Sequence, residues 1–347
     1  MKMNKILSAF AAALILAGCT AAPKAPAPIK MIFETDLGND VDDAVALDNI
    51  YKHIEDGRVE LLAICLNKEG RRAPEYADIL NTWYGYPDIP IGIIKDGPWC
   101  AYKNNYSQGV YDMTLEDGTP MFRGAHSEEE CAAFPDAVTL YRKTLSEQED
   151  NSVVIVSVGF FTNLARLLDS QGDEYSPLSG RELVARKVRL LSCMACCIDG
   201  ISQPDGEWNV KMDKMAAIKV YNEWPGTIVS SPAEVSEAVP ISREIIVDSL
   251  AWAGNHPVTK SFEAYFFNDI APSRPMFDPT SVIFAVEGPE MFTLSPCGKM
   301  TVDSTSVSTF TPCEGGNHYY FTVTPQQAEV VKDYISNLTK RIPESQK

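Results

Sequence analysis

Four aspartates fall within one short stretch of the chain: Asp36, Asp40, Asp42 and Asp43. Carboxylates this close repel one another unless a positive charge intervenes, and one Asp is enough to cap a helix. The surplus is therefore either a solvated acidic loop or a set of oxygen ligands for a hard cation. Calcium suits such a set better than magnesium, because Ca²⁺ accepts about six to eight oxygens in flexible geometry. The residues around Gly38 do not follow the EF-hand spacing.

The acidic stretch lies between a predicted strand, residues 31–35, and a predicted helix whose apolar residues recur at helical spacing as far as Gly57. Strands and helices alternate along most of the chain. Further strands are predicted at 59–66, 89–94, 152–158, 187–191 and 227–230, and further helices at 74–84, 136–148, 162–169, 212–221 and 325–338. Residues 240–267 are predicted to be mostly helical, 301–310 with 319–324 to form a hairpin, and 96–134 to be a long irregular segment.

This alternation predicts an α/β fold with a mostly parallel central sheet flanked by helices and a Rossmann-like core. The predicted strands are apolar on both faces, as expected for strands that helices cover on each side. Ligands of such sheets bind beyond the carboxyl ends of the strands. The acidic stretch lies there, immediately after the first strand.

The N-terminus indicates export. Residues 1–18 combine a basic start, an apolar run and a small-residue end, which is typical of a secretory signal. Residues 16–19 resemble the bacterial lipobox, which predicts lipidation at Cys19; an ordinary signal peptide is the alternative. Residues 19–30 then form a Pro/Ala tether, and 31–342 form a single domain. We therefore expect a lipoprotein of the cell envelope, on the periplasmic or cell-surface side, that contacts the membrane through its lipid alone.

Composition and charge exclude two classes of protein. Apolar residues make up 45% of the chain and charged residues 22%, so the chain is globular rather than disordered. The formal net charge of −17 argues against nucleic acid as a partner, because phosphate binding needs an excess of Lys and Arg.

Eight cysteines lie beyond the predicted lipidation site, and an exported chain can form disulfides. The first pairs to test are Cys100 with Cys131 and Cys297 with Cys313, since each closes a loop-rich stretch. Residues 193–197 contain a C-x-x-C motif. Zinc is less favoured there than burial or a disulfide, because the chain has no second C-x-x-C and no suitably spaced His pair.

Residues 34–47 resemble the D-T-D-P-G-x-D-D-A-x-A-L signature of inosine–uridine-type nucleoside hydrolases. Glu34 replaces the first Asp, Leu37 replaces the Pro, and two residues are inserted before the Asp pair. Segments that resemble other family motifs follow in order: Asn67 after the second strand, 159–165 like G-x-L-T-N-x-A, 207–216 like E-F-N-x-x-x-D-x-x-A, and the late Asp-Pro at 278–279. The resemblance extends from about residue 32 to 286, and five motifs in order are specific.

The resemblance implies a calcium site. Asp36 would bind Ca²⁺ and act as general base on a metal-bound water. Asp43 would be a bidentate ligand, and Asp278 and the backbone carbonyl of Val158 would be further ligands. Because of the insertion, Asp40 is an additional candidate ligand.

The resemblance also implies a sugar site. Asp42, Asn67, Glu207 and Asn209 would hold the ribose hydroxyls. The insertion leaves Asp40 as the alternative to Asp42. We favour Asp42 because the pair at 42–43 directly precedes the helix, as in the family.

The implied activity is calcium-dependent hydrolysis of the N-glycosidic bond of ribonucleosides, which releases free base and ribose. The residue types fit this chemistry independently of the resemblance. Carboxylates favour the positive charge of an oxocarbenium-like transition state, and a divalent cation lowers the pKa of its water.

The family commonly forms homodimers or homotetramers. One alternative is a lipoprotein that binds ribosides without hydrolysing them; another, a phosphatase of the haloacid dehalogenase class, is disfavoured by Glu34.

The departing base has no obvious proton donor. Many relatives place a His directly before the late Asp-Pro, where this chain has Phe277. We expect His53 to lie on the surface of a helix and the other three histidines to be structural or exposed. Trp208, Tyr319 and Tyr320 are candidates to stack on a base, although aromatic residues are more often part of a core.

Overall fold

The computed structural model describes residues 27–98, 105–265 and 272–346. Strand β1 (Ile29–Thr35) lies inside a ten-stranded sheet with the order β11-β10-β12-β6-β5-β4-β1-β2-β3, and β9 pairs with β12 outside this path. Every neighbouring pair from β3 to β12 is parallel. The other strands are β2 (Val59–Leu66), β3 (Ile91–Gly92), β4 (Val153–Val158), β5 (Val188–Met194), β6 (Ile228–Ser231), β9 (Thr293–Leu294), β10 (Gly298–Val302), β11 (Ser308–Pro312) and β12 (His318–Thr322).

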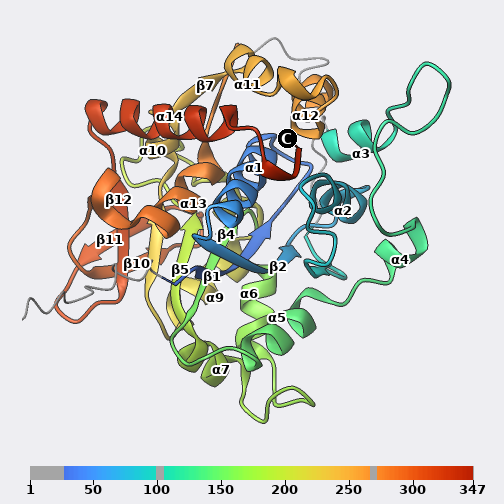
Figure 1. Ribbon diagram of the computed structural model, residues 1–347. Helices are drawn as coiled ribbons and strands as arrows, with labels where there is room; N and C mark the ends of the chain where they lie inside the picture. The colour runs from blue at the N-terminus through green and yellow to red at the C-terminus, as the bar shows by residue number, and fades with distance from the viewer. Residues whose placement is uncertain (1–26, 99–104, 266–271, 347) are drawn as a thin grey trace, which may run out of the picture.

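Helices cover both faces of this sheet (Figure 1). One face carries α1 (Asp42–Glu55), α2 (Ala73–Trp83), α10 (Ala233–Glu237), α11 (Arg243–Ser249), α12 (Pro257–Tyr265), α13 (Phe277–Glu287) and α14 (Pro325–Lys340). The other carries α5 (Ala137–Ser146), α6 (Thr162–Asp169), α7 (Gly180–Lys187), α8 (Trp208–Met212) and α9 (Lys214–Glu223). The shorter elements are α3 (Tyr106–Tyr111), α4 (Glu128–Ala132), the 3₁₀ turns at Ala251–Ala253, Gly288–Met291 and Glu344–Gln346, and a separate antiparallel pair, β7 (Pro240–Ser242) with β8 (Ser273–Pro275).

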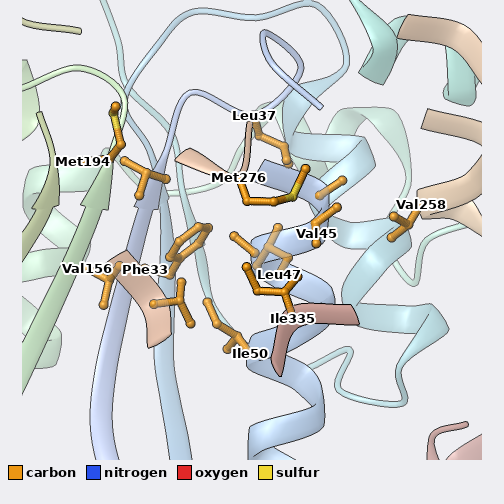
Figure 2. Close-up of a cluster of buried hydrophobic side chains, with 14 of the residues drawn as sticks. Phe33, Leu37, Val45, Leu47, Ile50, Val156, Met194, Val258, Met276 and Ile335 are labelled. Atoms are coloured by element: carbon orange, nitrogen blue, oxygen red, sulfur yellow. The ribbon is translucent and has the colours of Figure 1, made fainter. Parts of the chain in front are cut away.

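The central strands send alternate side chains into two apolar cores. In β1, Phe33 packs into the core under α1 and α13, whereas Ile32 packs into the core on the opposite face. In β4, Val156 and Ile155 divide in the same way. Figure 2 shows the first core, where Phe33 and Val156 face side chains of α1. The predicted α/β class with a mostly parallel sheet is therefore confirmed.

The predicted hairpin between 301–310 and 319–324 is wrong. Strands β10 and β11 form the hairpin, while β12 returns parallel to β6. Asp303 explains the difference, because its carboxylate accepts the backbone N–H groups of Thr305 and Val307 at 2.7 and 3.0 Å and so turns the chain within the predicted strand.

Two other predicted segments differ from the structure. Residues 240–267 begin with strand β7 before helices α11 and α12 follow. The described part of 96–134 contains the short helices α3 and α4.

The N-terminal predictions fall mostly outside the described residues, which begin at 27. The signal segment 1–18 and Cys19 lie there, and of the predicted tether only 27–30 is described, with β1 already starting at Ile29. Within the described ranges, none of the helices combines the length and the hydrophobicity that crossing a bilayer requires.

The expected pairing of Cys297 with Cys313 is absent from the structure, where both are free thiols. The Cys297 thiol instead donates to the backbone carbonyl of Cys313 at 3.3 Å. The other expected pair cannot be placed, since Cys100 lies outside the described residues.

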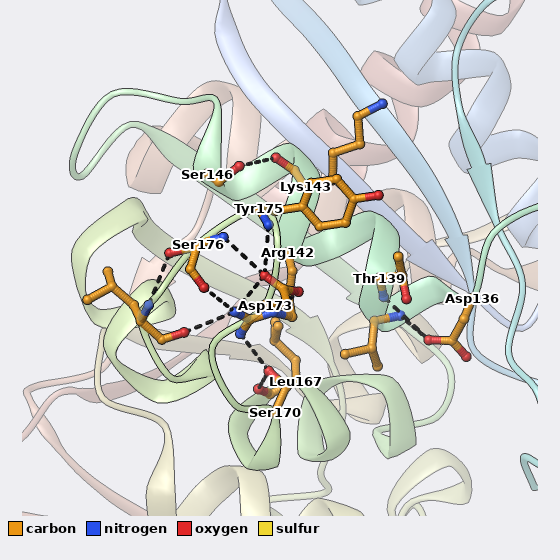
Figure 3. Close-up of polar contacts among 12 residues, drawn as sticks. Asp136, Thr139, Arg142, Lys143, Ser146, Leu167, Ser170, Asp173, Tyr175 and Ser176 are labelled. Carbon is orange, nitrogen blue, oxygen red and sulfur yellow. Dashed lines mark hydrogen bonds and ion pairs between the residues drawn. The ribbon is translucent and has the colours of Figure 1, made fainter.

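A buried arginine fastens the loop between α6 and α7 to helix α5 (Figure 3). The side chain of Arg142 is 3% exposed, and its Nε and Nη2 donate to the carboxylate of Asp173 at 2.5 and 3.1 Å. The same guanidinium donates to Ser170 Oγ and to the backbone carbonyls of Ser176 and Leu178. The Nε, Nη1 and Nη2 atoms of the buried guanidinium therefore all donate hydrogen bonds.

We predict that Arg142→Met lowers the free energy of unfolding by about 2 kcal/mol, because it removes the buried arginine of a part-buried ion pair and leaves the loop carbonyls without their donor. Arg181→Met is the matched control, since Arg181 is 53% exposed, and it should cost less than about 0.5 kcal/mol. Urea unfolding of both variants is the measurement. Equal losses from the two substitutions would contradict the role given to Arg142.

Candidate functional site

The N-termini of two helices meet at the carboxyl end of strand β1. Asp36 directly follows this strand, and Asp42 and Asp43 are the first two residues of α1. Asp278 lies in the first turn of α13, and its backbone N–H donates to Asp42 Oδ2 at 2.9 Å. Each helix N-terminus adds partial positive charge where the carboxylates gather. The structure thus brings together acidic residues that the sequence separates widely.

These carboxylates are buried, and some of their oxygens have no hydrogen-bond partner. Asp42 and Asp43 are 0% and 1% exposed, and Asp36 and Asp278 are each 6% exposed. The Thr35 hydroxyl donates to one oxygen of Asp43. Within the described residues, Oδ1 of Asp42 and Oδ2 of Asp43 meet no donor. A buried charged oxygen without a partner is costly, so the cluster needs a proton or a cation.

Burial and mutual repulsion shift the pKa values of the cluster. Burial raises the pKa of Asp36 to about 6, against the opposing charge of Lys68. Burial first, and neighbouring carboxylates second, raise the pKa values of Asp42, Asp43 and Asp278 well above the usual range. The protein alone therefore does not hold all four groups ionised at neutral pH. Four buried carboxylates, two of which have an oxygen without a partner among the described residues, fit a divalent cation that takes oxygen ligands.

A glycine allows the neighbouring strands to close around Asp36. Gly159 follows β4 with φ +109°, and a Cβ there would lie 2.7 Å from Asp36 Oδ1 and 2.8 Å from Asn67 Oδ1. Asn67, which follows β2, donates through Nδ2 to the Val158 carbonyl at 3.2 Å. Its own Oδ1 is buried without a partner among the described residues. The predicted ligand carbonyl and the predicted ribose-binding amide are therefore neighbours of Asp36.

Glu207 and Asn209 approach from the start of helix α8. The Glu207 carboxylate caps this helix by accepting the N–H groups of Asn209 and Val210 at 2.9 and 3.1 Å. Burial raises the pKa of Glu207 to about 7. The side-chain amide of Asn209 donates to the backbone carbonyl of Met194, at the end of β5, at 3.2 Å. Both side chains are thus fixed at the same edge of the sheet as Asp36.

A cavity of about 280 Å³ collects most of these groups. Its lining comprises Asp36, Asn39, Asp40, Asp42, Met194, Gln203, Glu207, Trp208, Asn209, Arg274, Phe277 and Asp278. Six of the residues predicted for the metal and sugar sites are on this lining. Asp43, Asn67 and Val158 are not, and are buried beside it.

The cavity wall contains an ion pair that was not predicted from the sequence. Arg274, on β8, donates through Nε to Asp40 Oδ1 at 2.8 Å and through Nη2 to Asp40 Oδ2. Asp40 therefore already has a cationic partner, which makes it a poorer metal ligand than Asp43. The sequence carries one signal for this role. Once Asp42 and Asp43 are matched to the family's Asp pair, Asp40 is the acid left over.

Two further residues that position Asp36 were also not predicted from the sequence. The side-chain amide of Asn39 donates to Asp36 Oδ2 at 2.8 Å. The Lys68 ammonium in turn donates to Asn39 Oδ1 at 3.4 Å and is 9% exposed. Asn39 lies inside the acidic stretch and Lys68 directly follows Asn67, so each lies next to a residue that the motifs identified.

Phe277 lines the cavity, whereas none of the four histidines is among its described lining residues. The prediction that His53 is a surface residue is wrong: it is 1% exposed, because α14 covers α1 and the Tyr334 ring stacks on the imidazole. Of the aromatic candidates, Trp208 lines the cavity and residues 319–320 do not.

A second group of side chains has ligand atoms within 4.8 Å of one another: Cys197, Asp199 and Glu234. Its carboxylates already accept backbone N–H groups. Asp199 accepts from Ile201 at 2.7 Å, and Glu234 accepts from Ile198 at 2.8 Å and from Asp199. These bonds fold the loop after β5, and they explain the cluster without an ion.

Comparison with known proteins identifies the chain's relatives. The family described as "Inosine-uridine preferring nucleoside hydrolase" matches residues 31–335. No curated protein sequence matches the chain.

Solved structures of nucleoside hydrolases share the fold. A purine-preferring ribonucleoside hydrolase from Gardnerella vaginalis is 17% identical, with 90% of this chain and 99% of that chain covered and a TM-score of 0.67. An inosine-uridine preferring nucleoside hydrolase from Bacillus anthracis is 17% identical, with coverage of 90% and 100% and a TM-score of 0.63. A plant nucleoside hydrolase is 17% identical, with coverage of 90% and 98% and a TM-score of 0.65.

We predict that the protein treated with EDTA becomes less stable as the pH rises from 6.5 to 8.5. The pKa values of the buried carboxyls are raised, to about 7 for Glu207 and well above the usual range for Asp43. The folded state therefore binds more protons than the unfolded state in this window, so stability falls with rising pH. The buried His53 and His256, whose pKa values burial lowers to about 4, are neutral in the folded state. In the unfolded state they lose their remaining protons between about pH 6.5 and 7.5, so they oppose the fall in stability only at the lower end of the window.

Thermal unfolding followed across this range is the measurement. Asp43→Asn should make the Tm less dependent on pH, whereas Glu116→Gln, at an exposed position, should leave the dependence unchanged. A Tm that rises from pH 6.5 to 8.5 would show that ionisation of the buried carboxyls does not destabilise the folded state.

Proposed function

Since the chain belongs to the inosine-uridine preferring nucleoside hydrolase family, we propose that this hydrolase cleaves the N-glycosidic bond of ribonucleosides and releases free base and ribose. The observation that carries the proposal is the buried carboxylate cluster at one wall of a cavity. Asp36, Asp42 and Asp278 line it, and Glu207 and Asn209 line it as well. A cluster of negative charge stabilises the oxocarbenium-like transition state of this reaction.

We propose that the carboxylate cluster binds a metal ion and that this ion is Ca²⁺. Asp36, Asp43, Asp278 and the carbonyl of Val158 would hold it, and the unpaired Oδ2 of Asp43 supports this assignment. When bound, the ion would lower the pKa of a water molecule and fix the ribose hydroxyls.

The chain's own side chains would act in two ways. Asp36, held by the Asn39 amide at 2.8 Å, would accept the proton of the attacking water. Asp42, Glu207 and Asn209 would bind the ribose hydroxyls and present the anomeric carbon to that water. Because Glu207 and Asn209 are fixed by backbone hydrogen bonds, binding the sugar orders few additional groups.

We also propose that the mature protein is anchored to the cell envelope through a lipid on Cys19 and cleaves extracellular nucleosides there. The signal-like segment 1–18, the lipobox-like residues 16–19 and the Pro/Ala-rich tether support this. The tether would leave the folded domain, which begins with β1 at Ile29, free in the aqueous phase.

We predict that the protein releases free base and ribose from at least one of inosine, uridine, adenosine and cytidine. Asp36→Asn should lower this rate by about 10²–10⁴-fold, because it removes the general base, while ribose still binds. Glu116→Gln is the matched control at an exposed acid and should keep the wild-type rate. Base release by chromatography and ribose binding by calorimetry are the measurements.

The same experiment separates catalysis from simple binding. If the wild type and Asp36→Asn both bind ribosides and neither releases base, the protein is a riboside-binding protein of this fold. That outcome would overturn the hydrolase proposal.

We predict about one calcium ion per chain after gentle purification, measured by metal analysis. Asp43→Asn should abolish stable binding, because it removes a buried ligand. Asp40→Asn should retain the ion, because Asp40 is already paired with Arg274. A chain without metal, or equal losses in the two variants, would refute this ligand assignment.

A further inference from the structure

The cavity offers a departing base no conventional proton donor. When the C1′–N bond breaks, the electron pair stays on the base nitrogen, so the base leaves as an anion unless a proton or a donor group meets it. Phe277 occupies the position before Asp278, and none of the four histidines lies on the described lining. Among the described lining residues, the acids are the carboxyls of the proposed sugar and cation site and Asp40, which is paired with Arg274.

One cationic side chain lies on the same wall as Phe277. Arg274 lines the cavity, its side chain is 25% exposed, and Asp40 binds it through Nε and Nη2. The guanidinium carbon lies 5.8 Å from the centre of the Phe277 ring and 5.6 Å from that of Tyr265. The two hydrogen bonds to the Asp40 carboxylate fix the plane of the guanidinium. A guanidinium has five N–H donors, and the two atoms that bind Asp40 do not use them all.

We propose that Arg274 binds the departing base, donating N–H hydrogen bonds to its acceptor atoms as the C1′–N bond breaks. This inference rests on the proposed function and names the residue that selects the leaving group. Asp40 is a positioning residue, since it touches the base only through Arg274.

The step balances without proton transfer from Arg274. The water oxygen bonds to C1′, Asp36 takes the water proton, and the electron pair of the C1′–N bond goes to the base nitrogen. The guanidinium keeps its proton, because its pKa lies above about 12, and it stabilises the anion by charge-assisted hydrogen bonds. The base then takes a proton from solvent as it leaves.

The planar donor pair of Arg274 implies a preference among bases. Two N–H groups match a carbonyl oxygen beside a ring nitrogen, which is the O6/N7 edge of a 6-oxopurine. A 6-aminopurine keeps N7 as an acceptor but presents a donor at position 6, so one of the two hydrogen bonds is lost. We therefore expect inosine to be cleaved faster than adenosine, and this preference to depend on Arg274.

Two ribosides and one base test the proposal. Inosine has a poor leaving group, whereas p-nitrophenyl β-D-ribofuranoside releases a stable anion that needs little help. Arg274→Gln should lower kcat/KM for inosine by about 10²-fold, as expected for the loss of one strong donor, and the loss should be at least about tenfold smaller for the p-nitrophenyl riboside. The variant should also bind hypoxanthine at least about tenfold more weakly, by calorimetry, while it binds ribose as the wild type does.

The controls keep the outcomes distinct. Arg181→Gln, at an exposed position that is not among the cavity-lining residues, should change none of these values. Asp40→Asn should reduce the ratio of inosine to adenosine cleavage, which a purely structural role would not change. Equal losses for both ribosides, or unchanged hypoxanthine affinity in Arg274→Gln, would overturn the role of Arg274. A wild type that cleaves neither riboside would overturn the proposed function, and the hypoxanthine comparison would still decide whether Arg274 binds the base.

Discussion

Repulsion among buried carboxylates at the carboxyl end of β1 is the constraint on which the site depends. Asp36, Asp42, Asp43 and Asp278 are all nearly inaccessible to solvent. Burial first, and neighbouring carboxylates second, raise the pKa values of Asp43 and Asp278. The fold opposes this repulsion with the N-termini of α1 and α13, but partial dipole charges are small beside four carboxylates. A divalent cation would resolve the conflict, and in the proposed function it would also lower the pKa of the attacking water.

The sheet order explains how distant residues reach this cluster. Strand β1 lies between β2 and β4, so the residues that follow all three strands come to one edge. Asn67 follows β2 and Gly159 follows β4, and the absence of a Cβ at Gly159 lets Asp36 and Asn67 approach. Parallel pairing therefore turns motifs spread along the sequence into one site.

The sequence predicted the α/β class and the acidic part of the cavity wall because both leave local signals. Apolar periodicity marks the elements, and each motif, such as the Asp pair at 42–43, directly follows a strand or begins a helix. The pairing of Asp40 with Arg274 left no such signal, because the two residues are 234 positions apart and meet only when β8 folds back on the cavity. His53 was misplaced for a similar reason: helical spacing gives its position on α1, but the cover comes from α14, near the other end of the chain.

Proton release on calcium binding tests the central claim most directly. If the cluster is the cation site, its carboxyls hold protons at pH 6.5 that the ion must displace, since their pKa values are raised in the metal-free protein. Calcium titrations by calorimetry in two buffers of different ionisation enthalpy should then give binding heats that differ between the buffers, and Asp43→Asn should abolish the binding. Calcium binding with the same heat in both buffers, or wild-type binding in Asp43→Asn, would contradict the claim.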